Sequence, residues 1–173
     1  MSANATYDFV VPIFIKGLTA YDHILSKAEA YAKEKGVDVD ATFFEARLVD
    51  DQLPLHFQVQ NTAKLAQINL GRLTGENVTP FEAEEKTVAG LRKVVQKTLE
   101  LLKSSDAAKA SGTEQNTIDL PTLGKTLKST VKDAVVNHGV PNFYFHLVTG
   151  YSILRAKGVQ LGKADYISSF LGI

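Results

Sequence analysis

The segment PNFYFHLVTGYSILRAKGVQLGKADY, residues 141–166, decides how the rest of the chain must be arranged. Proline is favoured at the first position of a helix because its missing N–H would be unpaired there, so Pro141 predicts a helix start. Glycine readily adopts the left-handed conformation that follows a last helical turn, so Gly158 predicts the helix end. The segment therefore predicts a helix from Asn142 to Lys157.

This predicted helix is apolar around most of its circumference. Spacings of three and four residues place one group of side chains on a single face: Phe143, Leu147, Gly150, Tyr151 and Leu154. Phe145, Val148 and Ile153 extend the apolar character to other faces. A helix with so little polar surface is typical of a central element that is covered on several sides.

The N-terminal part of the chain predicts a long helix that begins between Tyr7 and Val11 and runs to Lys35, with Gly36 after its last turn. Apolar residues recur along it at helical spacing: Phe14, Leu18, Tyr21, Leu25, Ala28 and Ala32. His23 lies on the opposite side by the same count. We therefore expect His23 to face solvent.

Residues 37–53 lack this periodicity and predict a connector with one helical turn from Thr42 to Arg47. Asp51 and Pro54 then predict the start of a second helix. Its core stripe comprises Leu55, Val59, Thr62, Ala63, Ala66, Leu70 and Leu73. A second apolar strip on its far side comprises Phe57, Leu65 and Ile68. Two strips indicate two sets of neighbours, and we interpret the second set as another subunit, which predicts a homodimer.

A third helix is predicted to open at Thr79 and Pro80, with Glu82 in a capping-box arrangement three residues after the threonine. Its core positions are Val88, Leu91, Val95, Thr98 and Leu102. Opposite them lie side chains that we expect to be solvated, namely Arg92, Lys93, Gln96, Lys97 and Glu100.

The connection to the last helix reads differently. Residues 104–116 are small and polar and predict a surface loop. The following segment predicts a short hairpin, with Thr117–Leu120 paired to Thr126–Thr130 around a Leu-Gly-Lys turn. After the last helix, Lys163–Leu171 is expected to form a short closing turn.

Two parts of the sequence resemble one family. PNFYFH (141–146), YSILRAKGV (151–159) and LGKADY (161–166) resemble the C-terminal signature of an uncharacterised domain-of-unknown-function family in the DinB/YfiT-like superfamily of four-helix bundles. ARLVDDQLPLHFQVQ, residues 46–60, is a second matching block at a fitting distance. The resemblance implies a mostly α, DinB-like four-helix bundle, with a small irregular or β element before the last helix. It implies a single domain over residues 1–173.

The resemblance also implies where a metal would be held. Many relatives in the wider superfamily bind a divalent metal through three histidines, one on the second helix and an H-x-x-x-H pair on the last. His56 and His146 match the first ligand and the first of the pair, but Gly150 stands at the third position. Two histidines are too few for a tight zinc site, so we expect no metal or cofactor. If a divalent metal is bound, its candidate ligands are His56, His146 and His138.

Composition excludes several classes of partner and chemistry. Nineteen basic and nineteen acidic residues give a formal net charge of zero, so we expect no binding to nucleic acid or to an anionic membrane. The absence of cysteine excludes disulfides and thiol chemistry. The sequence contains no signal peptide and no apolar run of membrane-spanning length, which predicts a cytoplasmic protein.

By helical count, His56 and His146 can both turn toward the bundle interior. One interpretation is a small-molecule pocket at the bundle end, formed by the two histidines with Tyr151 and Asn142. The other is that each histidine is structural and bonds to a neighbour such as Tyr151, Asn142 or Gln58. We favour structural histidines.

The LGKADY tail also permits two interpretations. Lys163 and Arg155 could bind an anion, or Asp165 could pair with a nearby base while Tyr166 packs the chain end. We favour the second, because exposed ion pairs are common and carry little functional information.

The sequence contains no phosphate loop, nucleophile elbow or H-E-x-x-H motif, so it names no reaction and leaves open whether the protein is an enzyme. One hypothesis is a small-molecule-binding protein or enzyme of the DinB-like type. The other is a non-enzymatic structural or interaction module, homodimeric, that has lost the superfamily metal site. A polar pocket that reaches both histidines would favour the first hypothesis, and a filled interior would favour the second.

Overall fold

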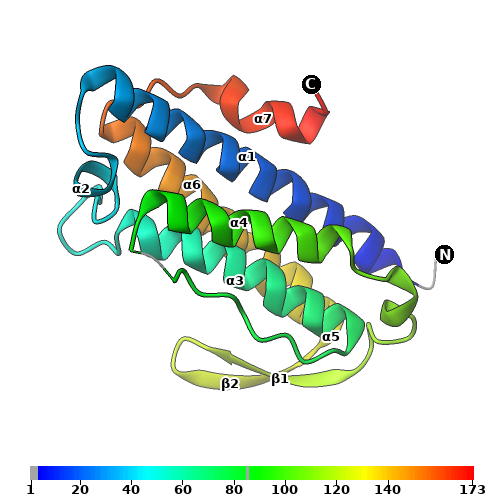
Figure 1. The fold of residues 1–173 in the computed structure, drawn as a ribbon. Helices are drawn as coiled ribbons and strands as arrows, with labels where there is room; N and C mark the ends of the chain where they lie inside the picture. Colours follow the sequence, from blue (N-terminus) through cyan, green and yellow to red (C-terminus); the bar gives the residue numbers. More distant parts are fainter. Residues whose placement is uncertain (1–3, 85) are drawn as a thin grey trace.

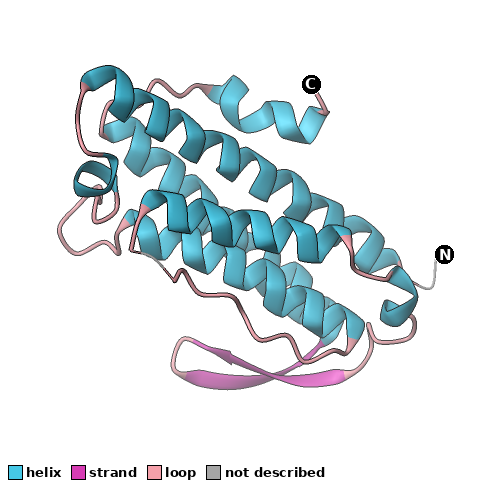
Figure 2. Ribbon diagram, viewed as in Figure 1, coloured by secondary structure: helices cyan, strands magenta, loops and turns pink. Residues whose placement is uncertain are grey.

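A computed structural model describes residues 4–84 and 86–173. It is mostly helical, with one small two-stranded sheet (Figure 2). Four long helices form a bundle: α1 Ala5–Lys35, α3 Leu55–Thr74, α4 Val88–Lys103 and α6 Val140–Ala156. The helix α4 packs on α1 and α3 from one side and α6 packs on them from the other, so α4 and α6 lie diagonally opposite (Figure 1). The predicted fold class is confirmed.

The first and last bundle helices have the predicted limits to within a few residues. Gly36 follows α1 with a φ of 65°, and Gly158 follows α6 with a φ of 96°. Residues that carry a side chain rarely adopt such positive φ values. Glycine at these positions therefore allows the chain to turn away from each helix end. Pro141 lies in the first turn of α6, as its sequence position predicts.

The helical turn in the first connector lies earlier than predicted. The helix α2 spans Val39–Phe43, not Thr42–Arg47. Asp38 determines this position, because its Oδ1 accepts a hydrogen bond from the backbone N–H of Ala41 at 2.8 Å. An N-cap of this kind satisfies a backbone donor that the first helical turn leaves unpaired.

The predicted start of the third helix is wrong. The helix α4 begins at Val88, after Thr87, whose side chain accepts a hydrogen bond from the N–H of Gly90. The Thr79-Pro80 segment before it lacks helical structure. It is held by side chains of other elements, since Gln67 accepts from the Phe81 N–H at 2.9 Å. The capping-box pattern could not reveal this competing long-range hydrogen bond.

The same segment covers much of the second apolar strip of α3. Leu65 is buried, and Phe57 and Ile68 are partly buried. Phe57 shares a groove with Pro80 and Phe81, and Ile68 shares another with Val78. The strip therefore has neighbours within the chain, so it no longer indicates a second subunit.

The predicted hairpin is present and longer than expected. Strand β1 Thr117–Thr122 pairs antiparallel with β2 Lys125–Thr130, and Thr117 lies opposite Thr130. Leu123 and Gly124 both have positive φ, as a two-residue turn between twisted strands requires. The hairpin lies along the outside of the bundle, beside α3 (Figure 1).

Three short helical elements lie between α4 and α6. A 3₁₀ turn, η1, spans Ala107–Ala110 within the predicted surface loop. A single helical turn, α5 Val131–Asp133, continues into a π-helical stretch, η2 Ala134–Gly139, which leads into α6. Such π-helical turns are rare and recur at functional sites.

The closing segment is a helix, α7 Lys163–Leu171, rather than a turn. It lies along α1 (Figure 1). Asp165 caps the first turn of α7, since its Oδ2 accepts from the Gly162 N–H at 2.7 Å. It also holds α7 against α1, since its Oδ1 lies 2.8 Å from Nζ of Lys27 and 3.0 Å from Nε2 of His23. His23 is exposed as predicted, yet it has this partner across α7.

Burial alone would raise the pKa of Asp165, but hydrogen bonds from Lys27, His23 and the Gly162 N–H, with the Lys27 charge, hold it well below its usual range. Tyr166 packs its ring 6.4 Å from that of Tyr151. Asp165 therefore pairs with nearby bases and Tyr166 packs the chain end, as we favoured.

The polar side of α4 is less solvated than predicted. Arg92 is partly buried and pairs with Asp22 at 3.0 Å and with Glu29 at 2.7 Å, both on α1. The hydrogen bonds that Arg92 donates to Asp22 raise the pKa of Arg92 against the effect of burial, and Glu29 raises it further. These charges join α1 to α4, whereas Lys97 and Glu100 are exposed.

The helix α6 is buried where it faces α1 and α3, and one strip of it stays exposed. Phe143, Leu147 and Leu154 are fully buried, as predicted. Phe145 and Val148, however, keep 62% and 45% of their surface exposed. α1, α3 and η2 pack on α6 as expected, but the strip that carries Phe145 and Val148 stays uncovered within the described chain.

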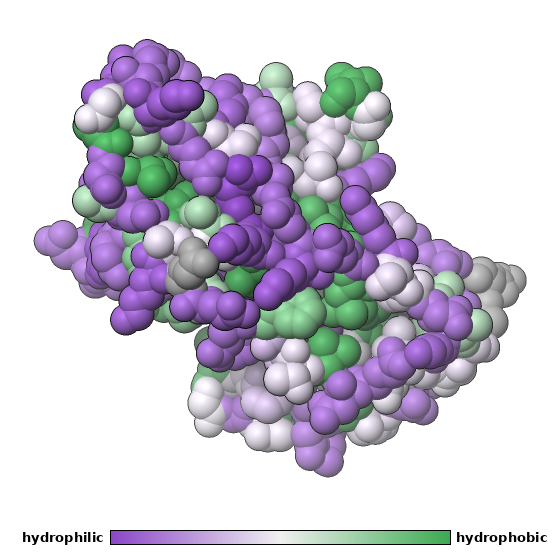
Figure 3. Space-filling view, viewed as in Figure 1, coloured by the Kyte–Doolittle hydropathy of each residue, from purple (hydrophilic) through white to green (hydrophobic). Residues whose placement is uncertain are grey.

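Within residues 4–84 and 86–173, no helix is both long enough and apolar enough to cross a membrane. The visible surface of α1 and α4 is largely hydrophilic, and apolar side chains gather in the recess between the bundle and the hairpin (Figure 3).

Candidate functional site

His146 is buried on α6, where it contacts α3. Its Nδ1–H donates to Oε1 of Gln58 at 2.7 Å, and its Nε2 accepts from Nδ2 of Asn61 at 2.6 Å. Gln58 is itself held, since its Nε2 donates to the Leu53 carbonyl at 2.8 Å. Both ring nitrogens therefore have protein partners, as a structural histidine requires.

These partners select one form of the imidazole. An amide oxygen can only accept and an amide NH₂ can only donate, so the ring is neutral with its proton on Nδ1. Burial lowers the pKa of His146 and favours the same neutral form. Protonation would place two donors, Nε2–H and the Asn61 amide, against each other.

We expect this arrangement to make stability depend on pH. Because the folded pKa of His146 lies below the unfolded value of 6.5, the stability it contributes is present above pH 6.5 and is lost as pH falls from there toward the folded pKa. Relative to His146→Gln, which does not titrate, the wild-type free energy of unfolding should fall by up to about 1.4 kcal/mol per pH unit. Urea denaturation between pH 7.5 and 5 measures this, and parallel curves for the two proteins would contradict it.

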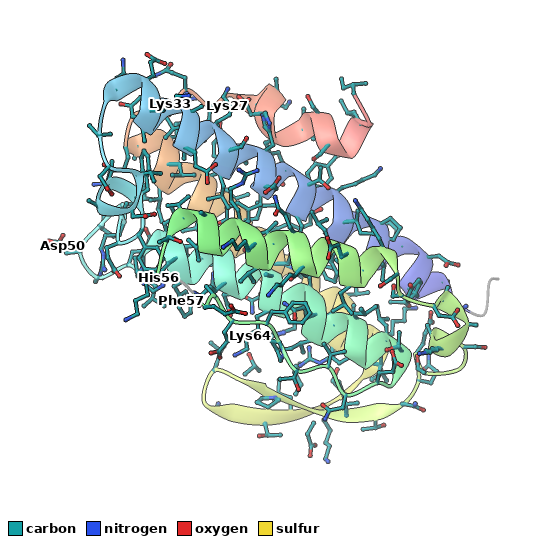
Figure 4. The ribbon with its side chains drawn as sticks, in the orientation of Figure 1. Lys27, Lys33, Asp50, His56, Phe57 and Lys64 are labelled. Carbon is teal, nitrogen blue, oxygen red and sulfur yellow. The ribbon has the colours of Figure 1, made fainter. Side chains whose placement is uncertain are left out.

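His56 has different partners. Its ring stacks on that of Phe44, with centroids 4.7 Å apart, and its Nε2 lies 3.4 Å from Oε1 of Glu45. It lies with Phe57 at the N-terminal end of α3 (Figure 4). Phe57, one residue on, contacts the His146 ring at a centroid distance of 5.8 Å. The two histidines thus lie near each other but have different partners: two amides for His146, and Phe44 and Glu45 for His56.

The position where relatives carry a third histidine is filled from α1. A Cβ at Gly150 would overlap the hydroxyl oxygen of Tyr21 and would lie 2.7 Å from its Cζ. Tyr21 is fully buried, and burial strongly raises the pKa of its phenol. Among the described residues, its hydroxyl has no hydrogen-bond partner. The glycine does not leave an open space, because Tyr21 occupies it.

The other predicted site residues are dispersed. Tyr151 lies on the α7 side of α6, beside Tyr166. Asn142 is partly buried one turn before His146, whose nitrogens bond to Gln58 and Asn61 instead. His138 lies on η2, with a buried Nδ1 that has no partner among the described residues. The sequence did not identify Asn61, because one amide among many polar helix residues carries no distinguishing signal.

The residues present do not fit the superfamily metal. His146 has both nitrogens engaged, and the third ligand position is covered by Tyr21. Within the part of the chain that the structure describes, no three His, Cys, Asp or Glu side chains lie close enough to hold an ion. A metal would have to displace Asn61 or Gln58 to reach the imidazole.

A shallow groove of about 260 Å³ runs beside His146, between α3 and the extended segment that precedes α4. Phe57 and Asn61, which both contact His146, line it together with Phe81. Lys64 also lines the groove and projects from the middle of α3 (Figure 4). This groove touches the predicted histidine only through intermediaries.

Comparisons with known proteins agree with this architecture. The family model described as "Domain of unknown function (DUF1993)" matches residues 6–167. The chain is also similar to a DinB family member protein from Shewanella denitrificans, whose crystal structure was determined at 1.83 Å resolution. The two are 36% identical, with a TM-score of 0.84 over 95% of this chain and 93% of that one. No curated protein matches the chain. The family resemblance and the DinB-like fold are confirmed.

Proposed function

We propose that this chain, which belongs to the DinB-like DUF1993 family, is a non-enzymatic interaction module that pairs with a second copy through the exposed side of α6. The observation that carries the proposal is the exposure of Phe145 and Val148 on a helix whose remaining large apolar side chains are buried or partly buried. An apolar helix is stable when all of its apolar faces are covered. The described chain leaves the strip with Phe145 and Val148 uncovered.

The exposed side extends onto α3. Phe145, Val148 and Ser152 follow one another at three- and four-residue spacing, and we call them the α6 face. The Phe145 ring lies 5.2 Å from that of His146, and the Phe57 ring of α3 contacts the same imidazole at 5.8 Å. Leu53, 52% exposed, lies beside Gln58 at the start of α3. Aromatic and aliphatic groups from two helices thus form one surface.

A second copy of the chain fits this surface better than a charged partner does. Phe145, Val148 and Ser152 are uncharged, although the exposed Arg155 follows one turn after Ser152, and the chain has a net charge of zero. These three side chains therefore offer a strongly charged partner little electrostatic complementarity. An apolar helix face is self-complementary, since the same side chains meet across a two-fold axis without repulsion. His146, buried and neutral beneath it, gives the surface a rigid support.

We expect wild-type protein to have twice the 18.8 kDa mass of one chain in light scattering at micromolar concentration. Phe145→Ser should return the mass to that of one chain, because it removes an exposed aromatic ring from the centre of the interface. Leu127→Ser, on the outer part of the hairpin, is the matched control and should leave the mass doubled. A wild-type monomer, or a Phe145→Ser dimer, would overturn the proposal.

The groove lined by Phe57 and Asn61 supports a second candidate, a small-molecule-binding protein. An occupant there would contact Asn61 and act on His146 through the Asn61 amide. Binding that is lost in Asn61→Ala but kept in Phe145→Ser would favour this candidate over the interaction module.

A further inference from the structure

A second groove lies under the base of the hairpin, at the C-terminal end of α3. Its volume is about 400 Å³. Ile68, Val78 and Ile118 give it apolar walls, and Arg72, Asn77 and Asn116 add polar groups. The groove is open to solvent, and its composition, mostly apolar surface with a few polar groups, is that of small-molecule sites.

Arg72 is the charged group that distinguishes this groove. It is partly buried, and its Nη1 donates to Oδ1 of Asn69 at 3.0 Å. Across residues 4–84 and 86–173 it makes no ion pair with a carboxylate. Glu76, in the same groove, is instead paired with Lys109 at 2.6 Å. The guanidinium therefore retains hydrogen-bond donors and a positive charge without a counterion.

The side chain of Arg72 is held in place by Asn69. Asn69 is fully buried, and its Nδ2 donates to the Leu65 carbonyl at 2.7 Å, which directs its Oδ1 toward Arg72. A Cβ at Gly139 would lie 2.5 Å from Nδ2 of Asn69, so a glycine on η2 makes room for this amide. The arrangement costs stability, because burying a cation without a partner is unfavourable.

His138, on η2, does not line this groove but lies close enough to Arg72 for the two charges to interact. Its Nδ1 is buried, with no hydrogen-bond partner in the described chain. Burial lowers the pKa of His138, and the positive charge of Arg72 lowers it further. Lys128 and Asp133 line the neighbouring groove with it. An anion beside Arg72 would relieve the repulsion that His138 experiences.

We infer that this groove binds a small organic carboxylate, with the Arg72 guanidinium bonding to the carboxylate and the apolar side chains of the groove contacting its hydrocarbon part. Guanidinium matches carboxylate in geometry and can donate two parallel hydrogen bonds. Ile68, Val78 and Ile118 favour a ligand with an apolar body over an inorganic anion. The inference goes beyond the pairing of two chains and is independent of it, because Arg72 lies about 22 Å along α3 from Phe57.

Calorimetric titration of the full chain with hexanoate, hexan-1-ol and inorganic phosphate tests the inference. Hexanoate should bind saturably at one site per chain, more tightly than hexan-1-ol or phosphate. Arg72→Gln should weaken hexanoate binding at least about tenfold, because it removes a charge-assisted hydrogen bond. Lys125→Gln, at the hairpin turn, is the matched control and should bind as wild type does.

A second variant and a second readout guard against a misfolded Arg72→Gln. Ile118→Thr keeps a β-branched strand residue and should weaken hexanoate while leaving phosphate unchanged. In wild-type protein, hexanoate should raise the pKa of His138 measured by NMR, since a bound anion favours the imidazolium. Absence of saturable hexanoate binding, equal binding by phosphate, undiminished binding by folded Arg72→Gln, or an unmoved His138 pKa would each overturn the inference.

Discussion

Gly150→Ala should destabilise the fold by at least about 3 kcal/mol, at or beyond the upper end of typical overpacking costs. The added Cβ would overlap the hydroxyl of Tyr21 and approach its Cζ to 2.7 Å, and Tyr21 is fully buried. Alanine is favoured over glycine in a helix by about 1 kcal/mol, so propensity predicts the opposite sign. Steric overlap in a filled interior should win, and urea denaturation measures the sum.

Tyr21→Phe isolates the cause. It removes a buried hydroxyl that has no partner among the described residues, so its own effect should be neutral or stabilising by up to about 1 kcal/mol. The double variant Tyr21→Phe with Gly150→Ala should be less destabilised than the single effects sum to, by more than about 1 kcal/mol. Additive effects would show that the phenol does not determine the glycine.

Leu147→Ala should cost about 2–5 kcal/mol. Leu147 is fully buried, and its Cδ2 lies only 3.4 Å from where a Cβ at Gly17 of α1 would stand. Truncation would leave a cavity between α1 and α6 that two packed helices cannot close. Chemical denaturation is the measurement, at one protein concentration for all variants because self-association shifts apparent stability.

Leu171→Ala is the matched control, since it deletes the same atoms at a helical position that is 64% exposed. Its effect should lie within about 0.5 kcal/mol of zero. A Leu147→Ala protein as stable as Leu171→Ala would mean that the buried face of α6 is misplaced.

The helices whose buried faces follow from a regular spacing of apolar residues were predictable. The stripes of α1, α3 and α6 follow from local spacing, and glycines 36 and 158 mark ends that local backbone conformation determines. The start of α4 was not predictable in this way, because Gln67 and Asp40 accept backbone hydrogen bonds from Phe81 and Val88. Those partners are distant in sequence. A capping pattern records only what lies within one turn.

The candidate site was predictable in part. The sequence indicates that His146 turns inward and offers a structural role for it, and Gln58 was among the suggested partners. It could not show Asn61 on the other nitrogen, nor that Tyr21 fills the space at Gly150, because both contacts join separate helices. Tyr151 shares the apolar stripe of α6, yet it lies beside Tyr166 of α7. The sequence predicts only a turn at α7, so it could not show that a packed helix meets Tyr151 there.

The exposure of α6 is the feature that local patterns misjudged most. Periodicity assigns Phe145 and Val148 to an apolar surface but does not say whether the same chain covers it. Here α1, α3 and α7 contact α6 without covering these two side chains. The uncovered surface is therefore where the proposed pairing can be tested by position.

Spin-label distances test the pairing most directly. The chain contains no cysteine, so Ser152→Cys on the α6 face and Glu100→Cys on the diagonally opposite α4 each accept one nitroxide. Pairing through α6 predicts a strong intermolecular dipolar coupling at Ser152→Cys, lost on dilution with unlabelled protein, and a longer distance at Glu100→Cys. No coupling at either position, or a shorter distance at Glu100→Cys, would contradict the proposal.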